Sequence, residues 1–186
     1  MGRDTAKQQR PIVEIRHFRM AFGDKTVIQD LSFEVRRGEV FGFLGSNGSG
    51  KTTTLRALLG LYEPTAGELL VDGKPYTVED SVKLGYLPEE RGLYKKEKVI
   101  DTMIYFGRLK GLGKEEARAF SMNYLERVGL SDKAKTRLDK LSGGQQQKIQ
   151  LGVTIMGDPE LLILDEPTKG FDPVNRRLLM NIIEER

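Results

Sequence analysis

The sequence predicts an α/β fold with a parallel-sheet core, an antiparallel β flank and an inserted α-helical subdomain. Residues 40–44 form a continuous apolar run that leads into a Gly-rich loop, which is typical of a buried parallel strand. Residues 161–164 form a second apolar run, and this one ends in two acids. Between these runs, residues 98–140 carry apolar side chains at helical spacing, so we expect a helical insertion there.

The composition is that of an ordinary globular domain. The chain has 186 residues, of which 38% are hydrophobic and 31% charged, enough for one α/β domain with a buried core. The net charge of +3 is spread along the chain, whereas a nucleic-acid-binding domain concentrates its basic residues in one stripe. The absence of cysteine excludes disulfides and thiolate metal sites, and no run reaches the roughly 18 apolar residues of a membrane span.

The order of the patterns divides the chain into a tail, a core and an insertion. We expect residues 1–10 to be a polar tail and residues 98–140 to be the helical subdomain. Residues 11–97 and 141–186 then form one core, incomplete at its C-terminal end. The strands and helices expected within the core, besides the two apolar runs, are 12–15, 31–35, 52–59, 67–71, 83–87 and 174–186.

The Gly-rich loop matches the phosphate-loop pattern of nucleotide-binding proteins. Its residues are Gly45, Ser46, Asn47, Gly48, Ser49, Gly50, Lys51 and Thr52. Glycines let successive backbone N–H groups point at one anion, and the start of the following helix adds positive potential. Lys51 supplies a charge to the β- and γ-phosphates, and the Thr52 hydroxyl can bind Mg²⁺. The alternative, a Gly-rich turn before a helix, is disfavoured by the predicted strand and helix on either side, so we expect a P-loop NTPase.

The second apolar run delivers Asp165 and Glu166 at its C-terminal end. In doubly wound folds this end of a strand faces the ligand, so Asp165 is expected to hold Mg²⁺ and Glu166 to act as general base. Taken alone, a buried strand that merely runs out into two surface acids is an equally good interpretation.

The segment Leu141-Ser142-Gly143-Gly144-Gln145 identifies the class. It is the signature of ATP-binding cassette (ABC) proteins. Together with the phosphate loop, the helical insertion, the acid pair and the Gly170-Phe171-Asp172-Pro173 segment, it stands in the family's order. From about residue 11 to residue 186 the chain resembles an ABC nucleotide-binding domain.

The resemblance implies an ATPase subunit that pairs head to tail with a second nucleotide-binding domain, identical or not, and drives a separate membrane-spanning subunit from the inner face of the membrane. Each chain would lend its signature to the ATP of its partner, and nucleic acid is not an expected ligand. Lys51 and Glu166 would be catalytic, and Thr52, Asp165 and Glu89 would bind Mg²⁺. The further ATP-binding positions implied are the remaining phosphate-loop residues with Phe22, Thr53, Ser142, Gly143, Gly144, Gln145 and Asp172. For Phe22, stacking on adenine competes with a strand position that faces the core.

Two departures from the family pattern stand out. Glu89 occupies the place of the usual glutamine, and the surrounding segment resembles bacterial drug and sodium exporter ATPases, which favours export. The sequence also ends before the family's switch histidine and the strand that precedes it, and His17 is expected to be a solvent-facing strand residue. We therefore expect a part of a longer protein, with low ATPase activity by itself.

Two rival functions stay open on the sequence. One is a non-transport ABC ATPase, although the distance from Lys51 to Leu141 leaves no room for the coiled coil of repair factors. The other is an ATP-binding assembly element with little turnover. A GTPase is disfavoured because no Asn-Lys-x-Asp segment is present.

Overall fold

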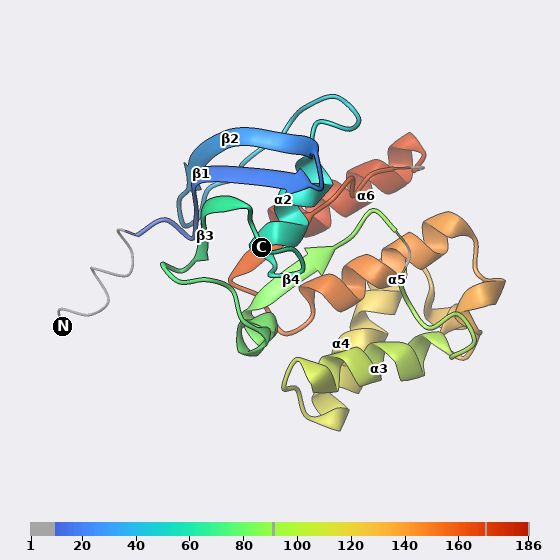
Figure 1. The fold of residues 1–186 in the computed structure, drawn as a ribbon. Coiled ribbons are helices and arrows are strands. Elements are labelled where there is room, and N and C mark those ends of the chain that lie inside the picture. The colour runs from blue at the N-terminus through green and yellow to red at the C-terminus, as the bar shows by residue number, and fades with distance from the viewer. Residues whose placement is uncertain (1–9, 91, 170, 186) are drawn as a thin grey trace, which may run out of the picture. The chain divides into compact units, whose positions relative to one another are not determined.

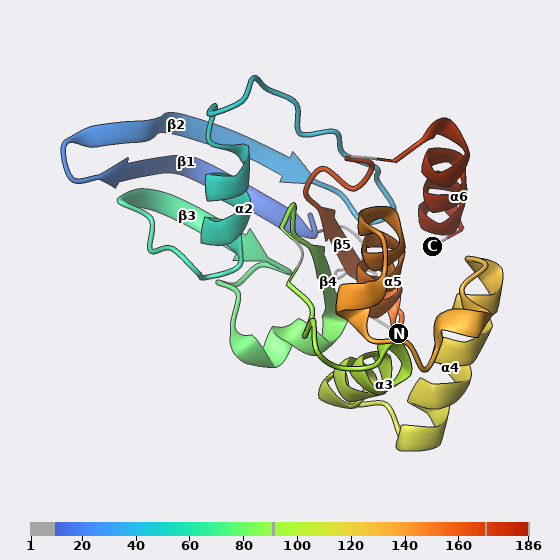
Figure 2. The same cartoon turned by 90° about the vertical axis from the view of Figure 1, so that its right-hand side faces the viewer.

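The computed structural model describes residues 10–90, 92–169 and 171–185, and the chain divides into two compact units at Asp80. The expected tail therefore lies almost wholly outside the described residues, as does Gly170. Each unit is described by itself below. Figures 1 and 2 show the elements of both.

The first unit contains an antiparallel sheet and one helix. Strands β1 (Val13–Phe22), β2 (Lys25–Val35) and β3 (Ala66–Val71) form the sheet in the order β2-β1-β3 (Figure 1). Helix α2 (Lys51–Leu58) follows the Gly-rich loop and contacts β3. The antiparallel flank and the helix after the loop are therefore confirmed.

A bulge in β1 explains the position of His17. The register with β2 shifts between Ile15 and Phe18, and His17 takes a left-handed φ of 48°. Its backbone N–H donates to Ser32 Oγ at 2.8 Å, and its side chain is 84% exposed. Such a bulge re-aims one side chain without ending the strand, and the expected solvent-facing position is confirmed.

The prediction of a buried strand at residues 40–44 is wrong for this structure. No strand is assigned there, and Val40 and Leu44 are 96% and 91% exposed. The ring of Phe41 instead stacks on that of Phe33 in β2, with centroids 4.9 Å apart. A strand needs a neighbour for its N–H and C=O groups, and no strand among the described residues pairs with this segment. The apolar pattern of a segment predicts that it is buried as a strand, but it does not predict which other strand pairs with it.

The second unit combines a parallel strand pair with helices. Strands β4 (Leu84–Leu87) and β5 (Leu161–Leu164) pair in parallel, with Leu87 opposite Leu164. The α-helices of this unit are α3 (Val99–Leu109), α4 (Lys114–Arg127), α5 (Gly143–Ile155) and α6 (Pro173–Glu184). Short 3₁₀ turns lie at Val78–Lys83, which runs across the boundary between the units, and at Ser131–Lys133 and Leu138–Lys140.

Helix α5 is the centre of the second unit. From Ile149 to Met156 it is buried on all sides, and it contacts β4, α3 and α4 (Figure 2). Lys110, at the C-cap of α3, donates to Thr154 O at 2.6 Å, and burial lowers the pKa of Lys110 to about 8. The core therefore fixes the direction of α5, and with it the position of the signature at the start of this helix.

Gly152 lets α4 approach α5 closely. A Cβ atom at Gly152 would lie 2.4 Å from the ring of Tyr124, whose hydroxyl donates to Lys148 O at 2.7 Å. Tyr124 is buried and held by this hydrogen bond, so its ring cannot swing away without leaving the hydroxyl unpaired.

We expect Gly152→Ala to lower the free energy of unfolding by about 1–3 kcal/mol because it overpacks this contact. A lower free energy of unfolding would indicate overpacking, because in a helix without such a contact alanine is more favourable than glycine by about 1 kcal/mol. Urea denaturation followed by circular dichroism measures it. Gly92→Ala is the matched control, because a Cβ there meets nothing within 4 Å. A Gly152→Ala protein as stable as this control contradicts the packing argument.

Candidate functional site

The phosphate loop belongs to the first unit and has an open anion-binding form. Gly48 and Gly50 take left-handed φ angles of 80° and 93°, which glycine adopts without strain. Gly50 is the N-cap of α2, and no side chain caps the first N–H groups of this helix. These N–H groups, with the positive end of the helix dipole, suit a phosphate.

The Lys51 side chain folds back over the loop. Its ammonium group donates to Gly45 O at 2.7 Å and to Ser46 O at 3.0 Å, so the loop curls around a positive charge. The curl is tight, because a Cβ at Gly45 would lie 2.6 Å from Ser49 Oγ. Buried Thr54 anchors the start of α2, since its hydroxyl donates to Gly50 O at 2.9 Å.

The other predicted residues of this unit lie on the loop or near its helix. Asn47 is exposed, and Thr52 and Thr53 are half-buried in the first turn of α2. Phe22, at the end of β1, is 47% exposed and contacts Tyr62 edge-on at 5.5 Å. It therefore does not face the core, and stacking on adenine stays a prediction.

The acid pair lies in the second unit, at the end of β5. Asp165 continues the ladder, because its N–H donates to Leu87 O at 2.8 Å, and it is 5% exposed. Glu166 takes a left-handed φ of 50°, and its side chain is 40% exposed. A left-handed glutamate costs about 1–2 kcal/mol, which the surrounding turn must offset. The chain thus buries one carboxylate and turns the next toward solvent.

Glu89 lies beside Glu166, and a cation that the sequence analysis missed lies between them. The ammonium group of Lys169 pairs with Glu89 Oε1 and lies 3.9 Å from Glu166 Oε2. The pKa of Lys169 is raised, mainly by its hydrogen bond to Glu89 and then by the nearby carboxylates. The spacing of Glu166 and Lys169 was the one sequence signal available, whereas Glu89 is distant in the chain.

The signature forms the start of α5. Ser142 is the N-cap: its Oγ accepts from Gln145 N at 3.3 Å, and its own N–H donates to Gln145 Oε1 at 2.9 Å. Gly143 and Gly144 fill the first turn, which contains no acidic residue. Gln145 therefore has a structural role as the second half of a capping box.

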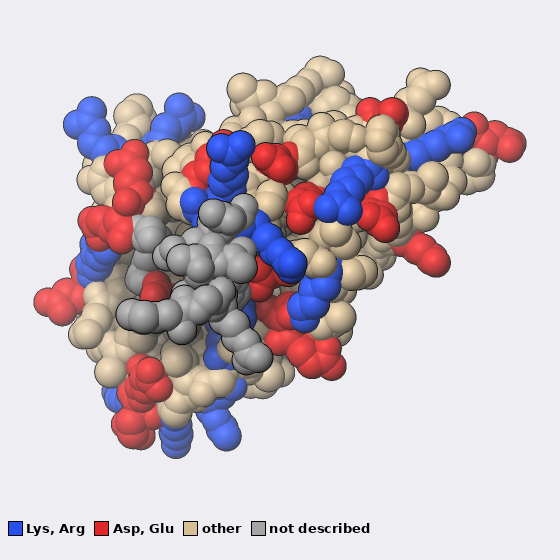
Figure 3. All heavy atoms as spheres, turned by 90° about the vertical axis from the view of Figure 1, so that its left-hand side faces the viewer, with Lys and Arg blue, Asp and Glu red and all other residues tan. Residues whose placement is uncertain are grey.

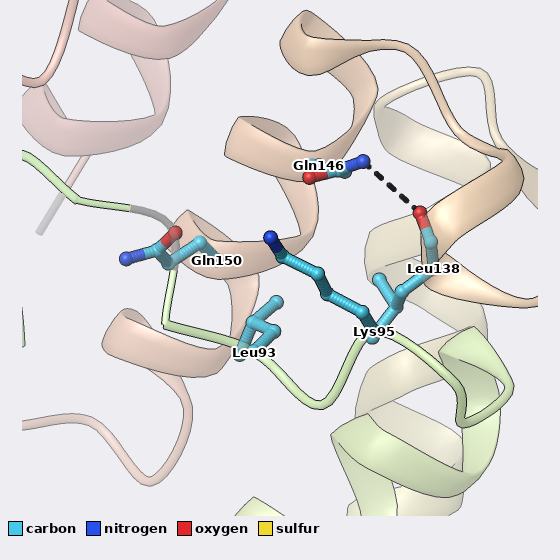
Figure 4. A pocket seen from close by; sticks show the side chains of 5 residues that line it. All are labelled: Leu93, Lys95, Leu138, Gln146 and Gln150. Atoms are coloured by element: carbon cyan, nitrogen blue, oxygen red, sulfur yellow. Dashed lines mark hydrogen bonds between the residues drawn. The ribbon is translucent and has the colours of Figure 1, made fainter.

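The next residue, Gln146, fixes the chain before the signature. Its Nε2 donates to Leu138 O at 3.1 Å (Figure 4). The same Nε2 donates to Leu141 O at 3.0 Å. Lys95 extends over the small cavity between Gln146 and Gln150. A cavity of about 10 Å³ holds one water molecule at most, so this space is not a ligand site.

Asp172 caps α6. Its Oδ1 accepts from Val174 N and from Asn175 N, both at 3.0 Å. These hydrogen bonds, first of all the one from the Asn175 N–H, lower the pKa of Asp172. The ring of the preceding residue, Phe171, lies against the signature, since a Cβ at Gly144 would meet it at 3.6 Å. The two motifs are therefore neighbours within one chain.

The geometry above agrees with the comparison with known proteins. The profile of the ABC transporter family matches residues 28–169, which include the phosphate loop, the signature and the acid pair. The chain belongs to the ABC transporter family. The expected P-loop α/β fold is confirmed by the structure of an ATP-binding subunit of an ABC transporter. It covers 94% of this chain and 74% of the other, with a TM-score of 0.84 and 27% identity.

Two curated ABC proteins cover most of the chain. An uncharacterized ABC transporter ATP-binding protein of Methanocaldococcus jannaschii is 45% identical over 95% of this chain and 64% of its own length. The linearmycin resistance ATP-binding protein of Bacillus subtilis is 34% identical over 94% of this chain and 57% of its own length. The chain thus spans less than two thirds of either relative.

The surface of this ABC chain carries mixed charges and, at the start of the helical segment, a group of aromatic rings. Figure 3 shows acidic and basic side chains interspersed over the face that it draws. Tyr94 and Tyr105 are 54% and 47% exposed, with ring centroids 5.8 Å apart, and both contact Phe106 of α3. Within the described part of the chain, no helix has the length and apolar character needed to cross a bilayer.

The cap at Asp172 predicts a pH dependence of α6. Because the folded-state pKa is lowered, the carboxylate stabilises the helix start above the unfolded-state pKa of about 3.9, and this is lost as the pH falls through the folded-state value. We expect amide exchange at Val174 and Asn175, corrected for intrinsic rates, to be slow near neutral pH and to accelerate only as the pH falls below the unfolded-state pKa of Asp172. Asp172→Asn keeps a good N-cap without the charge, so the protection of the Val174 and Asn175 amides against exchange should not change with pH in this variant. Equal acid sensitivity in both proteins contradicts this assignment.

Proposed function

We propose that this chain is the ATP-binding and ATP-hydrolysing part of an ABC transporter. The observation that carries the proposal is the phosphate loop, in which the Lys51 ammonium group is enclosed by the Gly45 and Ser46 carbonyls at an uncapped helix start. A triphosphate supplies the negative charge that this arrangement lacks. Its oxygens would take over the ammonium group and the N–H groups of the loop.

The residues present fit a Mg²⁺ ion. Mg²⁺ prefers hard oxygen ligands, and the Thr52 hydroxyl and the Asp165 carboxylate are of this kind, with the Glu89 carboxylate as a further candidate. When bound, the ion would neutralise charge on the β- and γ-phosphates. Thr52 belongs to the first unit and Asp165 to the second.

Glu166 would act as the general base. Its half-exposed carboxylate would accept a proton from the attacking water as the water oxygen forms a bond to the γ-phosphorus. The bond from this phosphorus to the bridging oxygen breaks, and ADP leaves with phosphate as the second product. Buried Asp165 is the neighbouring carboxylate, whose burial suits a fixed ligand rather than a mobile base.

A second nucleotide-binding domain would complete each site. The capped start of α5 presents the Ser142 hydroxyl and the first N–H groups of the helix, a second anion site on the same chain. In a head-to-tail pair, Ser142, Gly143, Gly144 and Gln145 would face the γ-phosphate held by the other domain. The Phe171 contact with Gly144 places the loop that carries Asp172 beside that surface.

Transport requires a membrane-spanning partner and a surface for it. The exposed rings of Tyr94 and Tyr105 suit a short helix of a membrane subunit at the inner face of the membrane. Three exposed lysines follow Tyr94 in the chain and could contribute to the same surface: Lys95, Lys96 and Lys98. The alternative for the lysines is plain solvated surface. Similarity to a resistance protein and the Glu89 segment support export as the direction.

We expect Lys51→Ala to abolish measurable Mg-ATP binding in calorimetry, because the loop loses the charge that faces the phosphates. Glu166→Gln should keep the binding and lower turnover by at least about 100-fold, because only proton transfer is lost. Phosphate release under saturating Mg-ATP measures turnover. Asn47→Ala is a milder loop control, since its exposed side chain is not part of the curl around Lys51.

Either of two results contradicts the proposal. One is Mg-ATP binding that survives Lys51→Ala unchanged, which would place the nucleotide elsewhere. The other is turnover by Glu166→Gln as fast as by the wild type.

A further inference from the structure

The register of β4 and β5 places two glutamates at the same level. Leu87 is opposite Leu164, and Glu89 and Glu166 each follow two residues later. Neighbouring strands lie about 4.8 Å apart, so residues at matched positions just beyond a parallel pair are close. The side chains of Glu89 and Glu166 are 39% and 40% exposed, so burial does not separate the two carboxylates. Two such carboxylates repel unless a cation lies between them.

Lys169 supplies that cation through a tight turn. Its backbone N–H donates to Glu166 O at 3.1 Å, which brings the lysine back over the end of β5. From there its ammonium group pairs with Glu89 and lies 3.9 Å from Glu166 Oε2.

We propose that Lys169 is a positioning residue of the hydrolytic site, whose ammonium group holds the carboxylate of Glu89 beside that of Glu166. This rests on the proposed function, in which Glu166 is the base and Glu89 a ligand near it. Without the cation, repulsion turns the two carboxylates apart, and the base loses its alignment with the attacking water.

The ion pair can be tested without nucleotide. Only the neutral amine reacts with acetic anhydride, so trace labelling read by mass spectrometry should show Lys169 reacting slowly in the wild type. Glu89→Gln should increase its rate by about threefold or more, because the ammonium group then loses the carboxylate that pairs with it. Lys83, which pairs with Glu160 at 3.4 Å in the same unit, is an internal reference whose rate should not change.

The role in turnover can be tested by a double-mutant cycle. Lys169→Met keeps the length of the side chain and removes its charge, and we expect it to lower kcat by about tenfold. In the Glu89→Gln background the same change should cost about twofold or less, because one of the two repelling charges is gone. Lys169→Arg keeps the charge and should recover most of the turnover lost in Lys169→Met.

The outcomes separate this inference from the proposed function. Two results overturn the inference alone. One is a labelling rate of Lys169 that does not change in Glu89→Gln. The other is a loss of kcat in Lys169→Met that is equal in both backgrounds, because the effect of the lysine would then come from its packing. Mg-ATP binding that survives Lys51→Ala unchanged overturns the proposed function, and the positioning role with it.

Discussion

The positions of Asp165, Glu166 and Glu89 in the second unit depend on one ladder of hydrogen bonds, the parallel pairing of β4 with β5. It runs without a shift from Leu84 opposite Leu161 to Leu87 opposite Leu164, and the Asp165 N–H extends it by one bond. Asp165 and Glu166 directly follow β5, and Glu89 lies two residues beyond the end of β4. A slip of one residue would turn Asp165 out of the interior and separate Glu89 from Lys169. The buried flank of α5 against β4 therefore matters to the chemistry as much as to stability.

The N-terminal ends of two helices offer positive potential to a phosphate. Helices α2 and α5 begin at the phosphate loop and at the signature, and neither has an acidic residue in its first turn. Helices α3 and α4, which carry no motif, have Asp101, Glu115 and Glu116 there, and α6 has an acid, Asp172, as its N-cap. An acid in the first turn would neutralise the positive end of the dipole. The chain thus keeps that potential open at the two helices proposed to face phosphate.

Local patterns made most of this predictable from the sequence. The helix after the phosphate loop and the two acids after β5 are each set by residues close in the chain, and the structure shows both where the sequence predicts them. The strand expected at residues 40–44 failed because pairing depends on a partner that periodicity cannot identify. Lys169 was missed for a related reason: its partner Glu89 lies 80 residues away, and only the register of two strands brings them together. The contact of Phe171 with Gly144 is likewise a product of packing.

The segment at residues 40–44 has a practical consequence for work with this chain in solution. It combines β-branched and aromatic side chains without a charge, and its backbone has no ladder within the described residues. A segment of this kind pairs readily with a second copy of itself. The apparent molar mass that light scattering reports should therefore rise as samples of the chain are concentrated. A single charged residue in place of the fully exposed Val40 is the simplest way to keep them dispersed.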